Sequence, residues 1–459
     1  MIKRTLHQIQ NMIKVENELI SFQEVSIEGV SIDSRKITQG NLFIPFKGEH
    51  SDGHRFVEDA LKKGAAAALW QKDVPNPPTN LPILVVEDTL LALQELARSY
   101  RNELDVKVVG ITGSNGKTTV KDMTANLLAL EYKVQKTEGN YNNHIGMPLT
   151  ILSLDENTDI AVLEMGMSGR GEIEFLSKLA RPDVVAITNI GESHLQDLGS
   201  REAIAQAKLE IIEGLNENGG LIIYFGDETL LREGLSSYQG RADIKTFGRI
   251  STNDLYPVEL ETNQNGSTFK INGVETEFAL PVLGAHNVLN ALSAMLAAQY
   301  FHIPFHKMND GFSSLKLTNM RMELVEGKNG EKIINDAYNA SPTSMKAAID
   351  LVSNLPDYDR KILVLGDMLE LGEKEKEFHV EMGKYIDPEK IDYVFTFGKL
   401  GAEIAAGAKT IFSAERVFSY TEKPSLIEEL EKYTNDETLV LVKASRGMKL
   451  EEVVNALLK

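Results

Sequence analysis

The chain has 459 residues, 42% of them hydrophobic, which is enough for about three domains of ordinary size. A formal net charge of −19 argues against nucleic acid and anionic membranes as partners. The chain has no cysteine, which excludes disulfides and thiolate chemistry, and no apolar run long enough for a signal peptide or a membrane span. We therefore expect a cytoplasmic protein, and we expect it to be a monomer.

Residues 1–102 are predicted to form a small α/β domain that ends in a linker at 101–105. Short apolar runs separated by polar and proline-rich loops predict its strands. The expected strands are 42–46, 65–70 and 83–86, and the expected helices are one that begins near Asp52 and one over 89–100.

Residues 103–316 alternate strand-like and helix-like segments, which predicts a mostly parallel sheet with helices on both faces. The expected strands are 106–111, 160–163, 184–188 and 221–224. Residues 244–282 differ, because turn signals such as Asn265-Gly266 separate short alternating segments, and we expect an antiparallel hairpin patch there. A helix after His286 closes this domain.

The stretch VKVVGITGSNGKTT (106–119) predicts a phosphate-binding loop between a strand and a helix. Lys117 would reach the β- and γ-phosphates, and the Thr118 hydroxyl would bind Mg²⁺. The strict motif requires glycine six residues before the lysine, where this chain has Ile111, so an ordinary strand-to-helix turn is the alternative. The expected ATP-binding residues here are Gly113, Ser114, Asn115, Gly116, Lys117, Thr118 and Thr119.

Two residues that follow neighbouring strands are candidates for metal binding. Glu164 ends the strand DIAVLE, and a carboxylate at that end of a sheet with a phosphate-binding loop suits Mg²⁺. His194 lies in the loop NIGESHL and could bind a second metal or orient a phosphate. The alternatives are a surface glutamate and a solvated loop histidine.

Lys208 lies in a helix expected after the N-cap Ser200, on the apolar stripe of that helix between Ile204 and Ile212. A cation in that position must extend to solvent, pair with an acid or lose its charge. A different hypothesis is that the Lys208 amine is carbamylated. The carbamate is an anion and could hold Mg²⁺.

Asn287 and Asn290 lie three residues apart at the start of the helix HNVLNALSAMLAAQYF, so they share a face. Their amides can both donate and accept, which suits the edge of a nucleotide base. Capping of the helix by Asn287 is the alternative.

Residues 317–459 are predicted to form a third, Rossmann-like α/β domain. It starts with a hairpin whose turn is Asn329-Gly330 and continues with strands at 361–365, 393–397 and 439–443. Arg321 and Asp336 lie near opposite ends of the hairpin and suit phosphate and ribose hydroxyls, respectively.

Taken together, several stretches resemble the Mur ligase family. They are TGSNGKTT, GNYNNHIGMPLT, LEMGMSGRGEI, TNIGESHL, AKLEII, GAHNVLNALSA and DAYNASPTSM, which occur in the family's order over almost the whole chain. The resemblance implies an ATP-dependent amide-bond ligase of peptidoglycan synthesis that proceeds through an acyl phosphate. It also accounts for the missing first glycine of the phosphate-binding loop.

The resemblance implies roles for residues in all three domains. Thr118 and Glu164 would hold one Mg²⁺, and His194 and carbamylated Lys208 would help to hold a second. Asn287, Asn290, Arg321 and Asp336 would contact ATP. The expected residues that bind the UDP-sugar-peptide are Ser34, Arg35, Lys47, Gly48, Asn142 and Asn143, and those near the incoming amine are Asp367, Ser445 and Arg446.

Within the family, DAYNASPTSM and LGDMLELGE resemble members that join D-alanyl-D-alanine to UDP-N-acetylmuramoyl-tripeptide. The members that add diaminopimelate or lysine carry a DNPR stretch, which this chain lacks. One alternative is a related ligase that adds another amino acid, such as a folylpolyglutamate-type enzyme. The other is a regulatory nucleotide switch, although the chain lacks the Asn-Lys-x-Asp stretch of guanine-binding switches.

Overall fold

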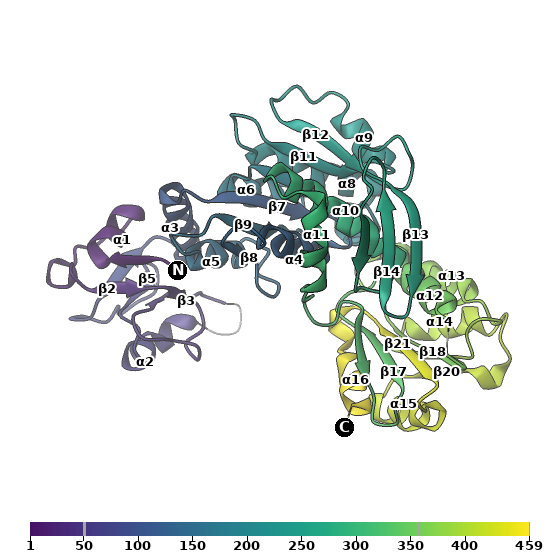
Figure 1. Cartoon of the computed structure of the whole chain (residues 1–459). Helices are drawn as coiled ribbons and strands as arrows, with labels where there is room; N and C mark the ends of the chain where they lie inside the picture. The colour runs from purple at the N-terminus through teal and green to yellow at the C-terminus, as the bar shows by residue number, and fades with distance from the viewer. Residues whose placement is uncertain (49–51, 357, 459) are drawn as a thin grey trace.

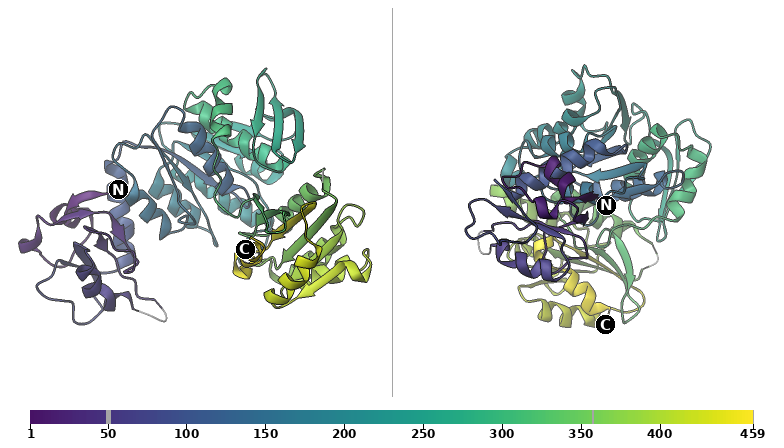
Figure 2. Two further views of the ribbon diagram at one scale, coloured as in Figure 1. Left: turned by 60° about the horizontal axis from the view of Figure 1, so that its bottom comes forward. Right: turned by 90° about the vertical axis from the view of Figure 1, so that its left-hand side faces the viewer.

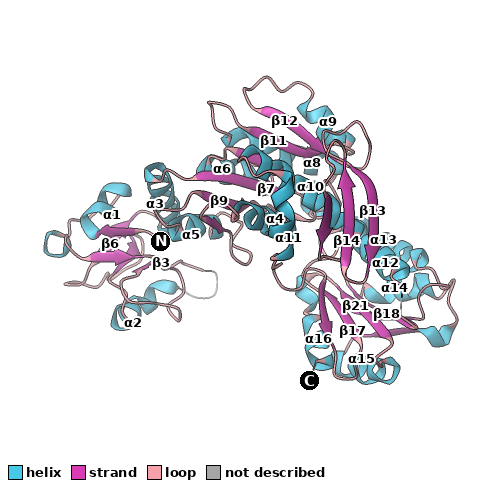
Figure 3. Ribbon diagram, in the orientation of Figure 1, coloured by secondary structure: helices cyan, strands magenta, loops and turns pink. Residues whose placement is uncertain are grey.

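The computed structural model describes residues 1–48, 52–356 and 358–458 and arranges them as three α/β units (Figure 1). The amino-terminal unit, purple, and the carboxyl-terminal unit, yellow, flank the central unit (Figure 2). Each unit consists of strands covered by helices (Figure 3). None of the helices in these described ranges is both long and apolar enough to cross a bilayer.

The amino-terminal unit contains β1 (Lys3–Thr5), α1 (Leu6–Met12), β2 (Ser26–Glu28), β3 (Val30–Ser31), β4 (Leu42–Phe43), α2 (Val57–Lys62), β5 (Ala67–Gln71), β6 (Ile83–Val86) and α3 (Thr89–Glu103). Strands β3-β4-β5-β6 form a parallel sheet, and β1 pairs with β2 in an antiparallel arrangement. The strand predicted at 83–86 is confirmed. The strand predicted at 42–46 is only two residues long, and the helix predicted from Asp52 starts as a 3₁₀ turn.

Helix α3 extends into the segment predicted as a linker. Its N-cap is Asp88, whose carboxylate accepts the Leu91 N–H at 2.8 Å, and the helix continues to Glu103. Arg101 is buried in its last turn and donates to the Ala180 carbonyl of the central unit at 2.7 Å. The two units are therefore joined by a helix and a buried hydrogen bond.

The central unit is built on a six-stranded parallel sheet. Its strands are β7 (Lys107–Thr112), β8 (Val134–Lys136), β9 (Ile160–Glu164), β10 (Val184–Ile187), β11 (Leu221–Phe225) and β12 (Asp243–Phe247), in the order β12-β11-β10-β7-β9-β8. Its helices are α4 (Lys117–Leu128), α5 (Gly146–Ser153), α6 (Glu172–Ala180), α7 (Leu195–Leu198), α8 (Arg201–Leu209), α9 (Thr229–Leu235), α10 (Ala285–Tyr300) and α11 (Met308–Ser313).

Alternate residues of β7, β9, β10 and β11 enter two different cores. Along β7, Val108 packs with residues of α3, α5 and α6, whereas Val109 and Ile111 pack with residues of α4 and α10. The prediction of a mostly parallel sheet with helices on both faces is therefore confirmed.

The hairpin patch predicted at 244–282 is partly wrong. Its first strand, β12, joins the parallel sheet beside β11. The remaining strands are β13 (Pro257–Asn263), β14 (Gly266–Ile271) and β15 (Glu277–Leu280), and they form a separate antiparallel sheet. The alternating pattern of 244–247 is that of a strand at the edge of the parallel sheet, whose side chains are mostly exposed.

The carboxyl-terminal unit contains β16 (Glu323–Glu326), β17 (Lys332–Asp336), α12 (Pro342–Asn354), β18 (Arg360–Gly366), α13 (Glu375–Tyr385), β19 (Tyr393–Phe397), α14 (Gly401–Ala408), β20 (Val417–Tyr420), α15 (Lys423–Leu430), β21 (Thr438–Lys443) and α16 (Glu451–Leu457). Its sheet has the order β16-β17-β21-β18-β19-β20, with β16 antiparallel to β17 and the other pairs parallel. The predicted hairpin and the three predicted strands are confirmed, and β20 was not predicted.

Short 3₁₀ turns occur in all three units. They lie at Ile20–Phe22, Gly53–Phe56, Glu210–Gly214, Phe305–Lys307, Gly372–Lys374, Ala414–Arg416, Glu431–Tyr433 and Arg446–Met448.

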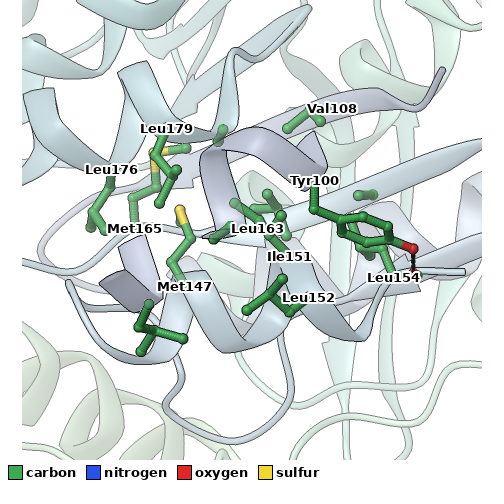
Figure 4. Close-up of a cluster of buried hydrophobic side chains, with 14 of the residues drawn as sticks. Tyr100, Val108, Met147, Ile151, Leu152, Leu154, Leu163, Met165, Leu176 and Leu179 are labelled. Carbon is green, nitrogen blue, oxygen red and sulfur yellow. Dashed lines mark hydrogen bonds between the residues drawn. The ribbon is translucent and has the colours of Figure 1, made fainter. Parts of the chain in front are cut away.

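Tyr100 of α3 is the largest fully buried side chain of the core shared by the amino-terminal and central units (Figure 4). It is fully buried, and its hydroxyl donates to the Leu154 carbonyl at 2.8 Å. Burial raises the pKa of Tyr100 to about 12, so the phenol stays protonated and keeps this bond.

We expect Tyr100→Phe to lower the free energy of unfolding by about 1–2 kcal/mol, because it leaves the buried Leu154 carbonyl without its donor. Tyr300→Phe is the matched control, since Tyr300 is 38% exposed and its change should stay within about 0.5 kcal/mol. Urea unfolding followed by circular dichroism measures both. Equal effects of the two substitutions would contradict the role given to the buried bond.

Candidate active site

The central strand order brings the candidate residues to one edge of the sheet. Strand β7 lies between β9 and β10, so the carboxyl ends of these three parallel strands are adjacent. The loop 113–116 follows β7, Glu164 ends β9, and the loop that carries His194 follows β10. In parallel α/β sheets this edge is where ligands bind.

The loop 113–116 has a backbone that only glycine fits at two positions. Gly113 and Gly116 have φ of +152° and +81°, and a Cβ on them would lie 1.8 Å from Thr188 Oγ1 and 2.5 Å from Asn290 Oδ1, respectively. Ile111, at the position of the absent first glycine, is a fully buried residue of β7. The strand, loop and helix therefore have the arrangement that binds phosphate, without that glycine.

Lys117 is the first residue of α4, and its Nζ donates to the Gly113 carbonyl at 2.8 Å. Burial lowers the pKa of Lys117, while the charge of Glu164 opposes that shift and the charge of Arg321 adds to it. The amine thus lies among the groups expected to handle phosphate and metal, and a phosphate near it would favour its charged form.

Thr118 Oγ1 joins three segments of the chain. It donates to Glu164 Oε2 at 2.8 Å and accepts from Arg321 Nη2 at 3.2 Å. The second oxygen of Glu164 accepts from Asn142 Nδ2 at 2.7 Å. A hydroxyl and a carboxylate at this position fit Mg²⁺, which takes few protein oxygens and completes its shell with phosphate and water.

Among the described residues, no group of three or more His, Asp or Glu side chains forms a complete metal site. His194 lies at the N-cap of α7 with φ +65°, and its Nδ1 lies 2.8 Å from Glu370 Oε2 of the carboxyl-terminal unit. The imidazole is therefore not merely solvated, because it contacts another unit of the chain.

Lys208 is buried, with 1% of its surface exposed, so it does not extend to solvent. Burial lowers the pKa of Lys208 well below its ordinary value, and the charge of Lys117 lowers it further. The neutral amine is the form that reacts with carbon dioxide, and a lowered pKa favours that form. The carbamylation hypothesis is therefore compatible with the environment of this side chain.

A cavity of about 360 Å³ opens between the central and carboxyl-terminal units beside the loop 113–116. Seven of the residues that line it were predicted from the sequence to bind ATP: Asn115, Gly116, Thr119, Asn287, Asn290, Arg321 and Asp336. Other lining residues had no predicted role. The charged ones among them are Arg201, Glu228, Arg249 and Lys443. Its volume is in the range of small-ligand sites.

Asn287 does not cap α10, because the N-cap is Gly284 and Asn287 lies inside the first turn. Its Nδ2 donates to the Leu283 carbonyl at 2.7 Å, and its Oδ1 accepts from Asn290 Nδ2 at 2.8 Å. The capping alternative is therefore wrong. Burial lowers the pKa of the adjacent His286 to about 4, so its imidazole is uncharged near neutral pH.

Arg321 precedes β16 and Asp336 ends β17, so these residues from opposite ends of the hairpin sequence lie together at its open end. Asp336 accepts from Met322 N at 3.3 Å and pairs with Lys443 on the neighbouring strand β21. The Arg321 guanidinium lies 4.1 Å from the ring centre of Tyr338. The two residues therefore reach the cavity together.

The amino-terminal unit has an open groove of about 540 Å³. Ser34, Arg35 and Gly48 line it together with aromatic residues such as Phe46 and Phe56, whereas Lys47 pairs with Asp73 at 3.1 Å. Arg35 is mostly exposed and holds the pKa of Asp33 down at about 2. Residues 49–51 of the same predicted loop lie outside the described residues.

A second cavity of about 580 Å³ lies between the amino-terminal and central units. It shares Ile32 and Asp33 with the open groove and extends to Tyr141, the neighbour of Asn142. Asn142 itself bonds Glu164, and the carboxamide of Asn143 accepts the N–H groups of Ile145 and Gly146 at the start of α5. Together the groove and this cavity lead from the amino-terminal unit toward Glu164.

Three family models match consecutive parts of the chain. They are described as Mur ligase family, catalytic domain (residues 26–101), Mur ligase middle domain (111–298) and Mur ligase, glutamate ligase domain (320–446). The chain belongs to the Mur ligase family. A relative from Bacillus subtilis named UDP-N-acetylmuramoyl-tripeptide--D-alanyl-D-alanine ligase is 54% identical over 459 residues, covering 100% of this chain and 99% of the relative.

Solved structures of the family share the arrangement. A crystal structure of MurF from Acinetobacter baumannii superposes with a TM-score of 0.87 at 28% identity, covering 100% of this chain and 99% of that one. MurF from Thermotoga maritima, in complex with ADP, gives 0.81 at 29% identity, covering 94% and 97%. The predicted three-unit α/β architecture of a Mur ligase is therefore confirmed.

In this Mur ligase the carboxyl-terminal unit contacts the rim of the loop 113–116. Thr343, in the first turn of α12, donates its hydroxyl to Glu192 at 2.8 Å, and Ser341 donates to Asn115 Oδ1 at 3.4 Å. The Glu370 carbonyl accepts the Gln196 N–H at 3.0 Å, beside the His194 contact. The nucleotide cavity is thus bounded by side chains of two units.

The residues expected near the incoming amine are used within the carboxyl-terminal unit. Asp367 Oδ1 accepts the Gly401 N–H at 2.7 Å at the start of α14, and Ser445 Oγ accepts the Leu369 N–H at 2.9 Å. Arg446 pairs with Glu451 at 2.8 Å and is about half exposed. Asp367 and Ser445 thus hold together the loops that follow β18, β19 and β21, whereas the Arg446 side chain is partly open to solvent.

We expect Gly116→Ala to weaken binding of a non-hydrolysable ATP analogue about tenfold or more, because its Cβ would displace Asn290. Gly171→Ala is the matched control, since Gly171 has a similar φ of +80° but open space around its Cβ. Isothermal titration calorimetry measures both. Equal losses would mean that backbone strain alone, and not the contact with Asn290, sets the affinity.

Proposed function

We propose that this chain is an ATP-dependent ligase that joins D-alanyl-D-alanine to UDP-N-acetylmuramoyl-tripeptide in peptidoglycan precursor synthesis. The observation that carries the proposal is the similarity to the Bacillus subtilis ligase of that name, at 54% identity over the full length of both chains. The site agrees with it, because the nucleotide cavity lies beside the loop 113–116. The cavity on the substrate side extends to Tyr141, next to Asn142, which donates to Glu164, the hydrogen-bond partner of Thr118.

The chemistry follows from what an amide bond requires. The terminal carboxylate of the tripeptide attacks the γ-phosphorus of ATP, and ADP leaves as an acyl phosphate forms. The dipeptide amine then attacks the acyl carbon, loses a proton, and phosphate leaves with its bonding electron pair. Both steps need aligned reactants and neutralised phosphoryl charge.

The nucleotide side of this mechanism belongs to the loop 113–116, α4 and the cavity. Lys117 and Arg321 would neutralise the phosphates, Asn287 and Asn290 would face the base, and Asp336 would take ribose hydroxyls. Mg²⁺ held by Thr118 and Glu164 would screen the phosphate oxygens. A second Mg²⁺ would use His194 and the carbamate of Lys208.

The substrate side of the mechanism belongs to the amino-terminal unit. Ser34, Arg35, Lys47 and Gly48 would hold the UDP end, and the peptide would follow the second cavity toward Asn142. Asp367, Ser445 and Arg446 would shape the dipeptide end. We assign residues 1–102 to UDP-sugar binding, 103–316 to ATP and 317–459 to closure over ATP and the dipeptide, in a monomer of the cytoplasm.

The acceptor assay separates this proposal from its alternatives. Purified protein with ATP and UDP-N-acetylmuramoyl-tripeptide should release phosphate rapidly only when D-alanyl-D-alanine is present. Turnover with glutamate or diaminopimelate instead would indicate another ligase of the family. Full turnover with ATP alone would indicate a regulatory nucleotide switch.

We expect Lys117→Ala to lower kcat/KM for ATP about a thousandfold, because the γ-phosphate loses its main cation. Lys107→Ala, at the exposed start of β7, is the control and should leave turnover unchanged. Circular dichroism checks that both variants are folded. Normal turnover of Lys117→Ala would contradict the phosphate role.

We expect Lys208→Ala to be inactive and to regain part of its turnover when acetate or propionate is added, since a small carboxylate can replace the carbamate. In the unsubstituted protein, ¹³C-bicarbonate should give a carbamate carbon signal by NMR that Lys208→Ala lacks. Full activity without the lysine, or no signal and no rescue, would argue against carbamylation.

A further inference from the structure

The segment between α11 and β16 is held in an unusual backbone conformation. Met320 and Met322 have φ of +62° and +53°, which is the left-handed region that residues with a side chain rarely adopt. Arg321 lies between them, and its guanidinium donates to the Thr118 hydroxyl. Such a conformation persists only where surrounding contacts fix it.

Backbone amides along this segment donate to carboxylates. Thr318 N donates to Asp122 Oδ2 at 2.8 Å, Met320 N to Glu323 Oε2 at 3.0 Å, and Met322 N to Asp336 Oδ1 at 3.3 Å. Two of the acceptors belong to the carboxyl-terminal unit. Asp122 belongs to α4 of the central unit, so it fixes the segment to the helix that starts at Lys117.

Asp122 is a buried anion, with 1% of its surface exposed. It accepts from Lys136 Nζ at 2.6 Å, lies 3.3 Å from Lys121 Nζ, and accepts the Thr318 hydroxyl at 2.9 Å. Burial acts to raise the pKa of Asp122, but the two lysines and the Thr318 N–H outweigh it and leave the pKa below its ordinary value. The carboxylate therefore stays charged and keeps its donors.

One turn of α4 separates Asp122 from Thr118, so the two side chains lie on the same face. The helix thus holds the segment twice, at Thr318 through Asp122 and at Arg321 through the Thr118 hydroxyl. Only two residues separate these two points, and one of them is the strained Met320. A shift of Thr318 would move Arg321 away from the hydroxyl.

We propose that Asp122 is a positioning residue, which fixes Thr318 so that Arg321 meets the phosphates of the nucleotide bound at Thr118. The proposal rests on the ATP role given to Arg321 under the proposed function. Asp122, which touches no substrate, thereby sets the affinity for ATP through its hydrogen bond to the segment between α11 and β16, which joins the central and carboxyl-terminal units.

Steady-state kinetics of the full chain with ATP, UDP-N-acetylmuramoyl-tripeptide and D-alanyl-D-alanine test the inference. Asp122→Asn should raise KM for ATP about tenfold. Thr318→Val, which keeps the N–H but loses the hydroxyl, should raise it about threefold and leave KM for the UDP-tripeptide within twofold. Ser314→Ala is the control, because Ser314 accepts from Asn126 of the same helix at 3.0 Å but lies farther from Arg321 along the chain than Thr318 does.

A double-mutant cycle decides whether Asp122 acts through Arg321. Arg321→Ala should raise KM for ATP, and neither Asp122→Asn nor Thr318→Val should raise it further in that background. Additive effects, or a loss of thermal stability without any change in KM for ATP, would overturn the inference. If Arg321→Ala left KM for ATP unchanged, both the ATP role of Arg321 and this inference would fail. The proposed function is tested separately: it would be contradicted if the unsubstituted protein did not release phosphate in response to D-alanyl-D-alanine.

Discussion

The hydroxyl of Thr118 is the contact on which the rest of the site depends. It donates to Glu164 at the end of the neighbouring strand and accepts from Arg321 of the segment that leads to the third unit. A P-loop, a carboxylate and a distant arginine are therefore held together by one oxygen atom. The next residue, Thr119, lines the nucleotide cavity, and Glu164 accepts from Asn142, next to Tyr141 of the cavity toward the amino-terminal unit. A reaction that joins the two ligands would therefore centre here.

Buried charge is the second feature that distinguishes this centre. Elsewhere the chain compensates its buried lysines, as with Lys443 beside Asp336 and Lys121 beside Asp122. For Lys208 the charged neighbour that acts on its pKa is another cation, Lys117, and its pKa falls well below the ordinary value. An uncompensated buried amine costs stability, and such costs persist where they serve function. A carbamate would reverse the charge and remove the conflict.

Much of the scaffold follows from the sequence, and the contacts between units do not. The alternation of strand-like and helix-like segments predicted β7, β9, β10 and β11 nearly to the residue, because each is a short run of apolar residues that a local pattern reveals. Strands β3 and β8, of two and three residues, carry too few residues for a pattern. The pairs Thr118–Arg321 and Asp122–Thr318 are separated by about 200 residues, so only the folded chain reveals them. Likewise, Lys443 meets Asp336 only because β21 lies beside β17.

The central claim is that the peptide carboxylate is activated by phosphorylation before the amine attacks. We would label both oxygens of the terminal carboxylate of UDP-N-acetylmuramoyl-tripeptide with ¹⁸O and analyse the released phosphate by ³¹P NMR or mass spectrometry. The account predicts that each turnover transfers one labelled oxygen from the carboxylate to phosphate, since the acyl C–O bond breaks when the amine adds. Unlabelled phosphate, released together with the amide product, would contradict it.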